Sequence, residues 1–300
     1  MARGAKARTI PHVLTRTFIH LPQVGPERER AFWADGLLCW DDMLSTRDLF
    51  DIGPPTSHEE CLVESRSRLA AGDARWFEEN LSSKHAWRMA ADFDDGRVAY
   101  LDIETDGSPG DHLPEGEDAP GGTTVVAVWD GLKARVFLRG LDLHELPAYL
   151  APYKVLCTFN GKFFDIPYLE KRYGKEFFPG AHLDLRPITT AVGLTGGLKK
   201  IEKLLGIQRP ADIQRYSGYD AVKLWGAYRA GRPDALEPLA RYNLADAVNL
   251  QALLRAAYNT AIVQDNLPFR RFDLLQEEGQ TEAVDAAIRD LMARQPEARP

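Results

Sequence analysis

The sequence has few cysteines, no long apolar run and no excess of basic residues. Its 300 residues include only Cys39, Cys61 and Cys157, which lie far apart and form no C-x-x-C pair. Neither a disulfide framework nor a thiolate zinc site is therefore expected, and a reducing, cytoplasmic location fits best. The longest uninterrupted apolar run spans residues 125–129, whereas a bilayer-spanning helix needs about 20 apolar residues. We expect no transmembrane helix and no membrane partner.

Basic residues are outnumbered by acidic ones. The chain has 37 Lys and Arg against 44 Asp and Glu, a formal net charge of −7. This balance argues at first sight against a polyanionic partner such as nucleic acid. The seven histidines show no H-x-x-x-H or H-E-x-x-H spacing, and there is no G-x-x-x-x-G-K-[ST] loop. These absences speak against a zinc hydrolase and an ATP-driven helicase. With 44% hydrophobic and 27% charged residues, the composition is still that of a folded globular protein.

The chain changes character in blocks that predict five regions. Residues 1–17 are basic and lack an apolar segment behind them, so we expect a flexible arm rather than a secretory signal. Residues 18–50 predict a small unit of two short helices, and residues 51–95 a helical connector. Residues 96–260 hold all the strand signals and form the main domain. Residues 261–300 are expected to form a C-terminal tail, which is amphipathic or ragged beyond Leu267.

Strand and helix signals in the main domain predict its fold. Strands are expected at residues 98–104, 123–129, 134–138, 154–159 and 182–185. The first three form an antiparallel meander, and a helix over residues 165–173 joins the last two. A long helix is expected over residues 236–258. The sequence thus predicts an α/β fold with a mixed five-stranded sheet and flanking helices, preceded by a small helical N-terminal region.

Two acids end the first predicted strand. Because strand side chains alternate, Asp102 and Glu104 project from one face while Leu101 and Ile103 face the core. Two carboxylates held side by side repel each other, and a bound cation is the usual remedy. Oxygen ligands select Mg²⁺ or Mn²⁺. The alternative is that both acids simply cap a strand at the solvent edge.

Two later segments add carboxylates. Asn160 and Asp165 follow the fourth predicted strand, at the sheet edge where α/β proteins usually bind ligands. Tyr242 and Asp246 are four residues apart and share one face of the long helix. Taken singly, Asp165 is also explained by helix N-terminal electrostatics, and Asp246 by a surface acid beside a core tyrosine.

The order of these segments resembles the three exonuclease motifs of the DEDD superfamily of 3′-5′ exonucleases, in its tyrosine-bearing variant. More closely, residues 98–254 are similar to the YprB-like exonuclease domain family, which has a ribonuclease H-like fold. Supporting positions include Lys199, Glu202, Tyr219, Trp225 and Asn243. The resemblance also extends to residues 21–44.

The resemblance implies phosphodiester hydrolysis with two Mg²⁺ or Mn²⁺ ions at a DNA or RNA 3′ end. It implies that Asp102 bridges both ions, that Glu104 and Asp246 hold the ion that activates water, and that Asp165 supports the second ion. Tyr242 would orient the attacking water, since its ordinary pKa near 10 makes it a poor base. Thr105 would contact the terminal nucleotide, and Asn160 the scissile region.

Alternative functions remain open. A non-catalytic nucleic-acid-binding or adaptor module could use the same fold, although no acid of the motifs is missing. A ribonuclease H-type endonuclease would distribute its acids differently over the sheet. Residues 21–26 resemble the turn of a helix-hairpin-helix, with Gln23 where the fuller pattern has glycine; this turn is either a structural hairpin or a phosphate contact. Without a strong basic stripe, we expect weak, salt-sensitive, sequence-independent binding.

Overall fold

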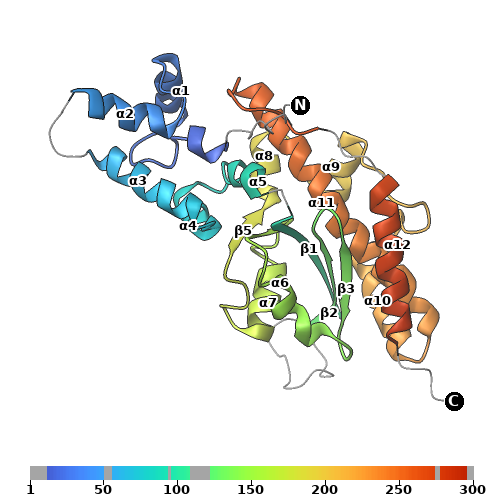
Figure 1. Ribbon diagram of the computed structural model, residues 1–300. Helices are drawn as coiled ribbons and strands as arrows, with labels where there is room; N and C mark the ends of the chain where they lie inside the picture. The colour runs from blue at the N-terminus through green and yellow to red at the C-terminus, as the bar shows by residue number, and fades with distance from the viewer. Residues whose placement is uncertain (1–11, 51–55, 94–95, 109–121, 274–277, 296–300) are drawn as a thin grey trace, which may run out of the picture.

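The computed structural model describes residues 12–50, 56–93, 96–108, 122–273 and 278–295. A helical region at the N-terminus precedes a sheet with helices on both faces (Figure 1). The N-terminal elements are η1 (Leu14–Arg16), α1 (Pro26–Ala34), α2 (Trp40–Phe50), α3 (Ser57–Ala70), α4 (Ala74–Asn80) and α5 (Trp87–Phe93).

Five strands form one mixed sheet in the order β3-β2-β1-β4-β5. They are β1 (Val98–Thr105), β2 (Thr123–Trp129), β3 (Ala134–Leu138), β4 (Val155–Thr158) and β5 (Ala181–Asp184). The first three form an antiparallel meander, whereas β4 pairs in parallel with both β1 and β5. The predicted mixed five-stranded α/β sheet is confirmed, and β1 lies at its centre.

Helices cover both faces of the sheet. They are η2 (Leu143–Glu145), α6 (Leu146–Leu150), α7 (Asp165–Tyr173), α8 (Leu185–Ala191), α9 (Leu198–Leu205), α10 (Gly218–Arg229), η3 (Pro233–Ala235), α11 (Leu236–Gln264) and α12 (Glu278–Ala293). Val126 and Val128 of β2 are buried with α6 and α7, while Val125 and Ala127 are buried with α10, α11 and α12. Because both faces of β2 are buried, consecutive residues of the strand are apolar instead of alternating with polar ones. None of the helices within the described ranges has the length and apolar character of a membrane span.

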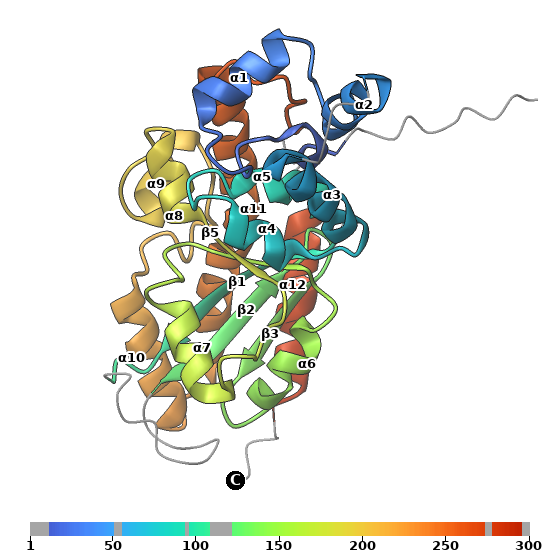
Figure 2. The ribbon, with the colours of Figure 1, turned by 90° about the vertical axis from the view of Figure 1, so that its left-hand side faces the viewer.

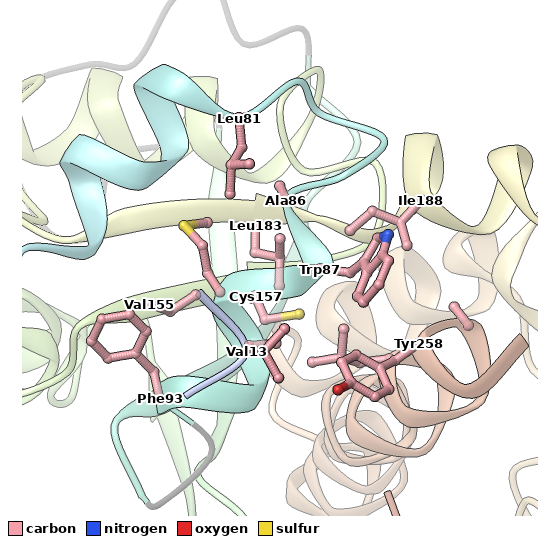
Figure 3. Packing of buried hydrophobic residues seen from close by; sticks show 14 of the residues in the cluster. Val13, Leu81, Ala86, Trp87, Phe93, Val155, Cys157, Leu183, Ile188 and Tyr258 are labelled. Carbon is pink, nitrogen blue, oxygen red and sulfur yellow. The ribbon is translucent and has the colours of Figure 1, made fainter. Parts of the chain in front are cut away.

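The N-terminal helical region packs on the end of the sheet next to β5. Trp87 of α5 meets Tyr258 of α11 edge to face, with ring centroids 5.0 Å apart (Figure 3). A buried ion pair joins Arg88 of α5 to Glu29 of α1, with nitrogen–oxygen distances of 2.6 and 2.9 Å.

In the turn that resembles a helix-hairpin-helix, Gln23 has φ 60°, a left-handed conformation that favours glycine.

Two terminal segments differ from the sequence expectation. Residues 1–11 of the expected flexible arm lie outside the described residues, but residues 12–17 are packed: Asp92 accepts hydrogen bonds from the backbone N–H groups of Val13 (2.9 Å) and Leu14 (2.7 Å). The expected C-terminal tail contains α12, which packs against β3 and α11 and buries Ile288 and Leu291. Residues 12–17 and α12 both extend the hydrophobic core, because burying their apolar side chains against it is favourable.

Candidate active site

The end of β1 carries two acids on the face that α11 covers. Leu101 and Ile103 lie buried among residues of α6 and α7, and the alternation of the strand turns Asp102 and Glu104 the other way. Glu104 is only 8% exposed. A β-bulge between Glu104 and Thr105 interrupts the pairing with β2 there. Such bulges redirect side chains and are frequent beside active sites.

The turn between β4 and α7 has a backbone that few residues permit. Asn160 has φ 64°. A Cβ on Gly161 would lie 2.1 Å from the hydroxyl oxygen of Thr158, so only glycine fits at this position. Asp184 of β5 accepts a 2.7 Å hydrogen bond from the backbone N–H of Asn160. This contact fixes the turn to the neighbouring strand.

That turn places Asp165 at the first position of α7, next to β1. Asp165 is 3% exposed, and its Oδ1 accepts a 3.2 Å hydrogen bond from the backbone N–H of Ile103. A helix N-terminus and a backbone donor both favour a carboxylate at this position.

Helix α11 supplies the remaining side chains. Tyr242 and Asp246 lie on one face of the helix, as their spacing predicts. Asn243 donates from Nδ2 to Oδ2 of Asp102 at 2.7 Å. Asp102, Glu104 and Asp246 each offer one carboxylate oxygen, and these oxygens lie within 4.8 Å of one another. An acidic group of this size can hold a metal ion.

The site residues predicted from the sequence line one cleft of about 480 Å³. Its lining includes Asp102, Glu104, Thr105, Asn160, Asp165, Tyr242 and Asp246. Asp165 lies outside the group of three closest acids but borders the same space. The rim carries the exposed aromatic side chains of Phe164 and Tyr219, and Tyr219 is 70% exposed.

The acids of the cleft are electrostatically strained. Burial raises the pKa values of Asp102 and Glu104 far above their ordinary range, and repulsion from Asp246 and Asp165 raises them further. Burial also raises the pKa of Asp165 to about 7, although backbone hydrogen bonds oppose the shift. A bound cation would favour the charged forms of all these groups.

Arg209, which no sequence motif singles out, is a buried cation beside the cleft. Its guanidinium donates to both oxygens of Glu202, at 2.6 and 2.7 Å, and also to Asp246. Asn249 donates to the same Glu202 carboxylate at 2.9 Å. Burial raises the pKa of Asp246, and the charge of Arg209 opposes that rise. The sequence signal for this cation is Glu202, which neighbours the apolar Ile201 on α9. A buried carboxylate needs a charged or hydrogen-bonding partner, and Arg209 is that partner.

Tyr242 keeps its proton at neutral pH. Burial raises its pKa, and the nearby charges of Asp246, Glu104 and Asp102 raise it further. The ammonium of Lys199 lies 4.6 Å from the centroid of the Tyr242 ring. The phenol can therefore orient a hydrogen-bonding partner but is a poor proton acceptor.

Comparison with protein families identifies the fold. The family model of the RNase_H superfamily matches residues 99–258, more than half of the chain. The chain belongs to the RNase_H superfamily. The part matched by the RNase_H superfamily runs from β1 into α11 and contains the seven cleft residues that the sequence predicts as site residues.

Among the solved structures that are similar to this RNase_H-superfamily chain is one at low identity. It is a family B DNA polymerase from the hyperthermophilic archaeon Pyrobaculum calidifontis, with a TM-score of 0.38 and 16% identity. The similarity covers 55% of this chain and 24% of the polymerase chain, so the chain spans about a quarter of that protein. Comparison with curated proteins gives no match.

The cleft of this RNase_H-superfamily chain fits a divalent cation. The closest donors, from Asp102, Glu104 and Asp246, are all carboxylate oxygens, the ligands that Mg²⁺ and Mn²⁺ prefer. Burial raises the pKa values of Asp102 and Glu104, repulsion from Asp246 raises them further, and a divalent ion would relieve this repulsion.

Proposed function

We propose that the cleft is the active site of a metal-dependent 3′-5′ exonuclease acting on DNA or RNA. The gathering of Asp102, Glu104, Asp165 and Asp246 around one cleft with Tyr242 carries this proposal. These residue types stand in the order, and on the elements, that the tyrosine-bearing DEDD motifs imply.

Each acid has a proposed role. Asp102, Glu104 and Asp246 would hold one Mg²⁺ or Mn²⁺ ion, and Asp102 with Asp165 a second. Bound ions of this kind lower the pKa of water and stabilise the charge on the leaving oxygen. The bond from Asn243 fixes one oxygen of Asp102, so this ligand is oriented before any ion binds.

Tyr242 would position the attacking water through its hydroxyl. Its raised pKa keeps the proton on the phenol, so orientation is favoured over proton abstraction. This assignment predicts that the phenol contributes to the rate but not to metal affinity.

Thr105 and Asn160 are the proposed substrate contacts. Thr105 lies at the β-bulge that borders the acids. Asn160 accepts a 2.6 Å hydrogen bond from Nη1 of Arg186 through Oδ1, which leaves its amide NH₂ to donate to a phosphate oxygen.

The proposed function also assigns domain boundaries and a more specific family to the chain. We assign residues 96–260 to the exonuclease domain and place the chain in the YprB-like family, because residues 21–44 also share that pattern. On this assignment, residues 18–50 and 51–95 are accessory to the exonuclease domain.

A panel of DNA and RNA strands labelled separately at each end tests the activity. With Mn²⁺ or Mg²⁺, we expect a 5′-labelled strand to shorten stepwise and a 3′-labelled strand to release a labelled mononucleotide first. Asp102→Asn and Asp246→Asn should abolish both signals, whereas Asp234→Asn, at an exposed acid of η3, should not. Release of the 5′-terminal nucleotide first, or degradation that survives both cleft variants, would contradict the proposal.

One observation favours a second candidate, a non-catalytic nucleic-acid-binding or adaptor module. Asp246 is already paired with a protein cation, Arg209, and so part of its charge is neutralised without metal. This candidate predicts that the panel strands bind but stay intact at every Mn²⁺ and Mg²⁺ concentration.

A further inference from the structure

A second, larger groove lies beside the cleft. It has a volume of about 1160 Å³ and runs between α4 with the segment after it on one side and α7, β5 and α8 on the other. Helix α4 packs against β5 and lies above α7 in Figure 2. The N-terminal helical region therefore forms one wall of the groove, and the RNase_H-superfamily part forms the other.

The groove is basic although the chain as a whole is acidic. Its basic lining residues are Arg75, Lys84, Lys162, Lys175 and Arg186, and its acidic ones are Glu78, Glu170 and Asp184. Lys84, Lys162 and Lys175 are exposed and form no ion pair with any residue that the structure describes. Glu78 and Asp184 each accept a 2.7 Å hydrogen bond from a backbone N–H group. These hydrogen bonds partly offset the negative charge of the two carboxylates. Three exposed lysines without an ion pair to a described residue thus line the groove.

The turn after β4 lies between the groove and the cleft and contributes residues to both. Lys162 and Phe163 line the groove, while Asn160 and Asp165 of the same turn line the cleft. Arg186 also spans the boundary, because it borders the groove and donates to Asn160. Phe163 is 79% exposed at this junction. An exposed aromatic ring next to unpaired lysines is the combination that binds single-stranded nucleic acid, by stacking on bases and pairing with phosphates.

We propose that this groove binds the backbone of a single-stranded nucleic acid whose 3′ end lies in the cleft. The inference rests on the proposed function for the position of the 3′ end. Lys84, Lys162 and Lys175 contact phosphates, and a base stacks on Phe163. The N-terminal helical region is then part of the substrate site, because it contributes Lys84.

A charge-neutralising triple variant tests the groove. Lys84→Gln, Lys162→Gln and Lys175→Gln are combined in one chain, and the matched control combines Lys133→Gln, Lys171→Gln and Lys203→Gln, which are exposed lysines outside the groove. Binding of a 5′-fluorescent oligothymidylate of about 20 nucleotides is followed by anisotropy in EDTA over a range of salt. Each lost phosphate contact reduces the slope of log K against log salt by about 0.7. The slope of the groove variant should therefore be smaller by about 2, and its binding more than tenfold weaker at about 50 mM salt. The control should follow the wild type.

A second readout separates this proposal from the proposed function. Hydrolysis of a p-nitrophenyl ester of thymidine monophosphate with Mn²⁺ requires only the cleft and should be equal in both triple variants. If the groove variant binds the strand as tightly as the control, or if polyglutamate binds the wild type as well as the strand does, the groove assignment is overturned. If wild-type protein cleaves neither substrate but groove-dependent binding remains, the exonuclease function fails and the groove stands.

Discussion

Replacing Asp165 by asparagine is expected to stabilise the metal-free protein, although it removes a proposed metal ligand. Burial raises the pKa of Asp165 from 3.8 to about 7. Each pKa unit corresponds to about 1.36 kcal/mol, so the charged form costs on the order of 4 kcal/mol above that pKa. An amide carries no charge, but its NH₂ group would be left in the cleft at a cost of about 1 kcal/mol. The expected net gain is about 2 to 3 kcal/mol.

The pH dependence of this gain has a defined sign. Because the pKa of Asp165 is higher in the folded than in the unfolded protein, the folded protein holds more protons between about pH 4 and pH 7. Wild-type stability from this group therefore falls as pH rises through that window and stays low above it. The advantage of Asp165→Asn is absent near pH 4 and complete above about pH 7.

Urea unfolding in EDTA at pH 8 and near pH 4 measures the free energies of unfolding. Saturating Mn²⁺ should then stabilise the wild type more than the variant. Asp220→Asn is the control, since hydrogen bonds from Ser217 lower the pKa of Asp220 and an amide there should destabilise at pH 8. If Asp165→Asn at pH 8 in EDTA is no more stable than the wild type, burial does not disfavour the charged form of Asp165 as described.

Three further substitutions test other parts of the structure. Arg88→Ala leaves the buried Glu29 carboxylate without its ion pair and should lower the free energy of unfolding by about 3 to 5 kcal/mol; a loss below about 1 kcal/mol in urea would contradict the role of this pair. Arg209→Gln removes a cation beside Asp246 and should tighten Mn²⁺ binding by about tenfold in calorimetry, so weaker binding would show that Arg209 instead positions the ligand. Tyr242→Phe should slow cleavage by about a hundredfold with unchanged Mn²⁺ affinity, and a full-rate variant would exclude the phenol from the reaction.

The sequence predicts the strands and the acids of the cleft because their signals are local. Alternation in β1 is enough to place Asp102 and Glu104 on one face, and helical spacing does the same for Tyr242 and Asp246. The parallel pairing of β1 with β4 then brings Asp165 to the same sheet edge. Each step uses contacts within one element or between neighbouring elements.

Long-range contacts between unpatterned segments could not be predicted in this way. Arg209 lies in the loop after α9, and its bond to Asp246 spans 37 positions, so no periodicity connects them. Helix α12 buries Ala287, Ile288 and Leu291 against β3 and α11, a long-range contact that its own sequence pattern does not indicate. The basic groove joins distant segments around Lys84 and Lys162, which the net charge of −7 conceals.

Anomalous diffraction from crystals soaked in Mn²⁺ tests the metal site most directly. We expect two anomalous peaks in the cleft, both next to Asp102, one shared with Glu104 and Asp246 and the other near Asp165. Asp102→Asn crystals treated in the same way should lose at least one peak. A cleft without anomalous density at saturating Mn²⁺, in wild-type crystals with the acids ordered, would contradict the proposal that these carboxylates form a divalent-metal centre.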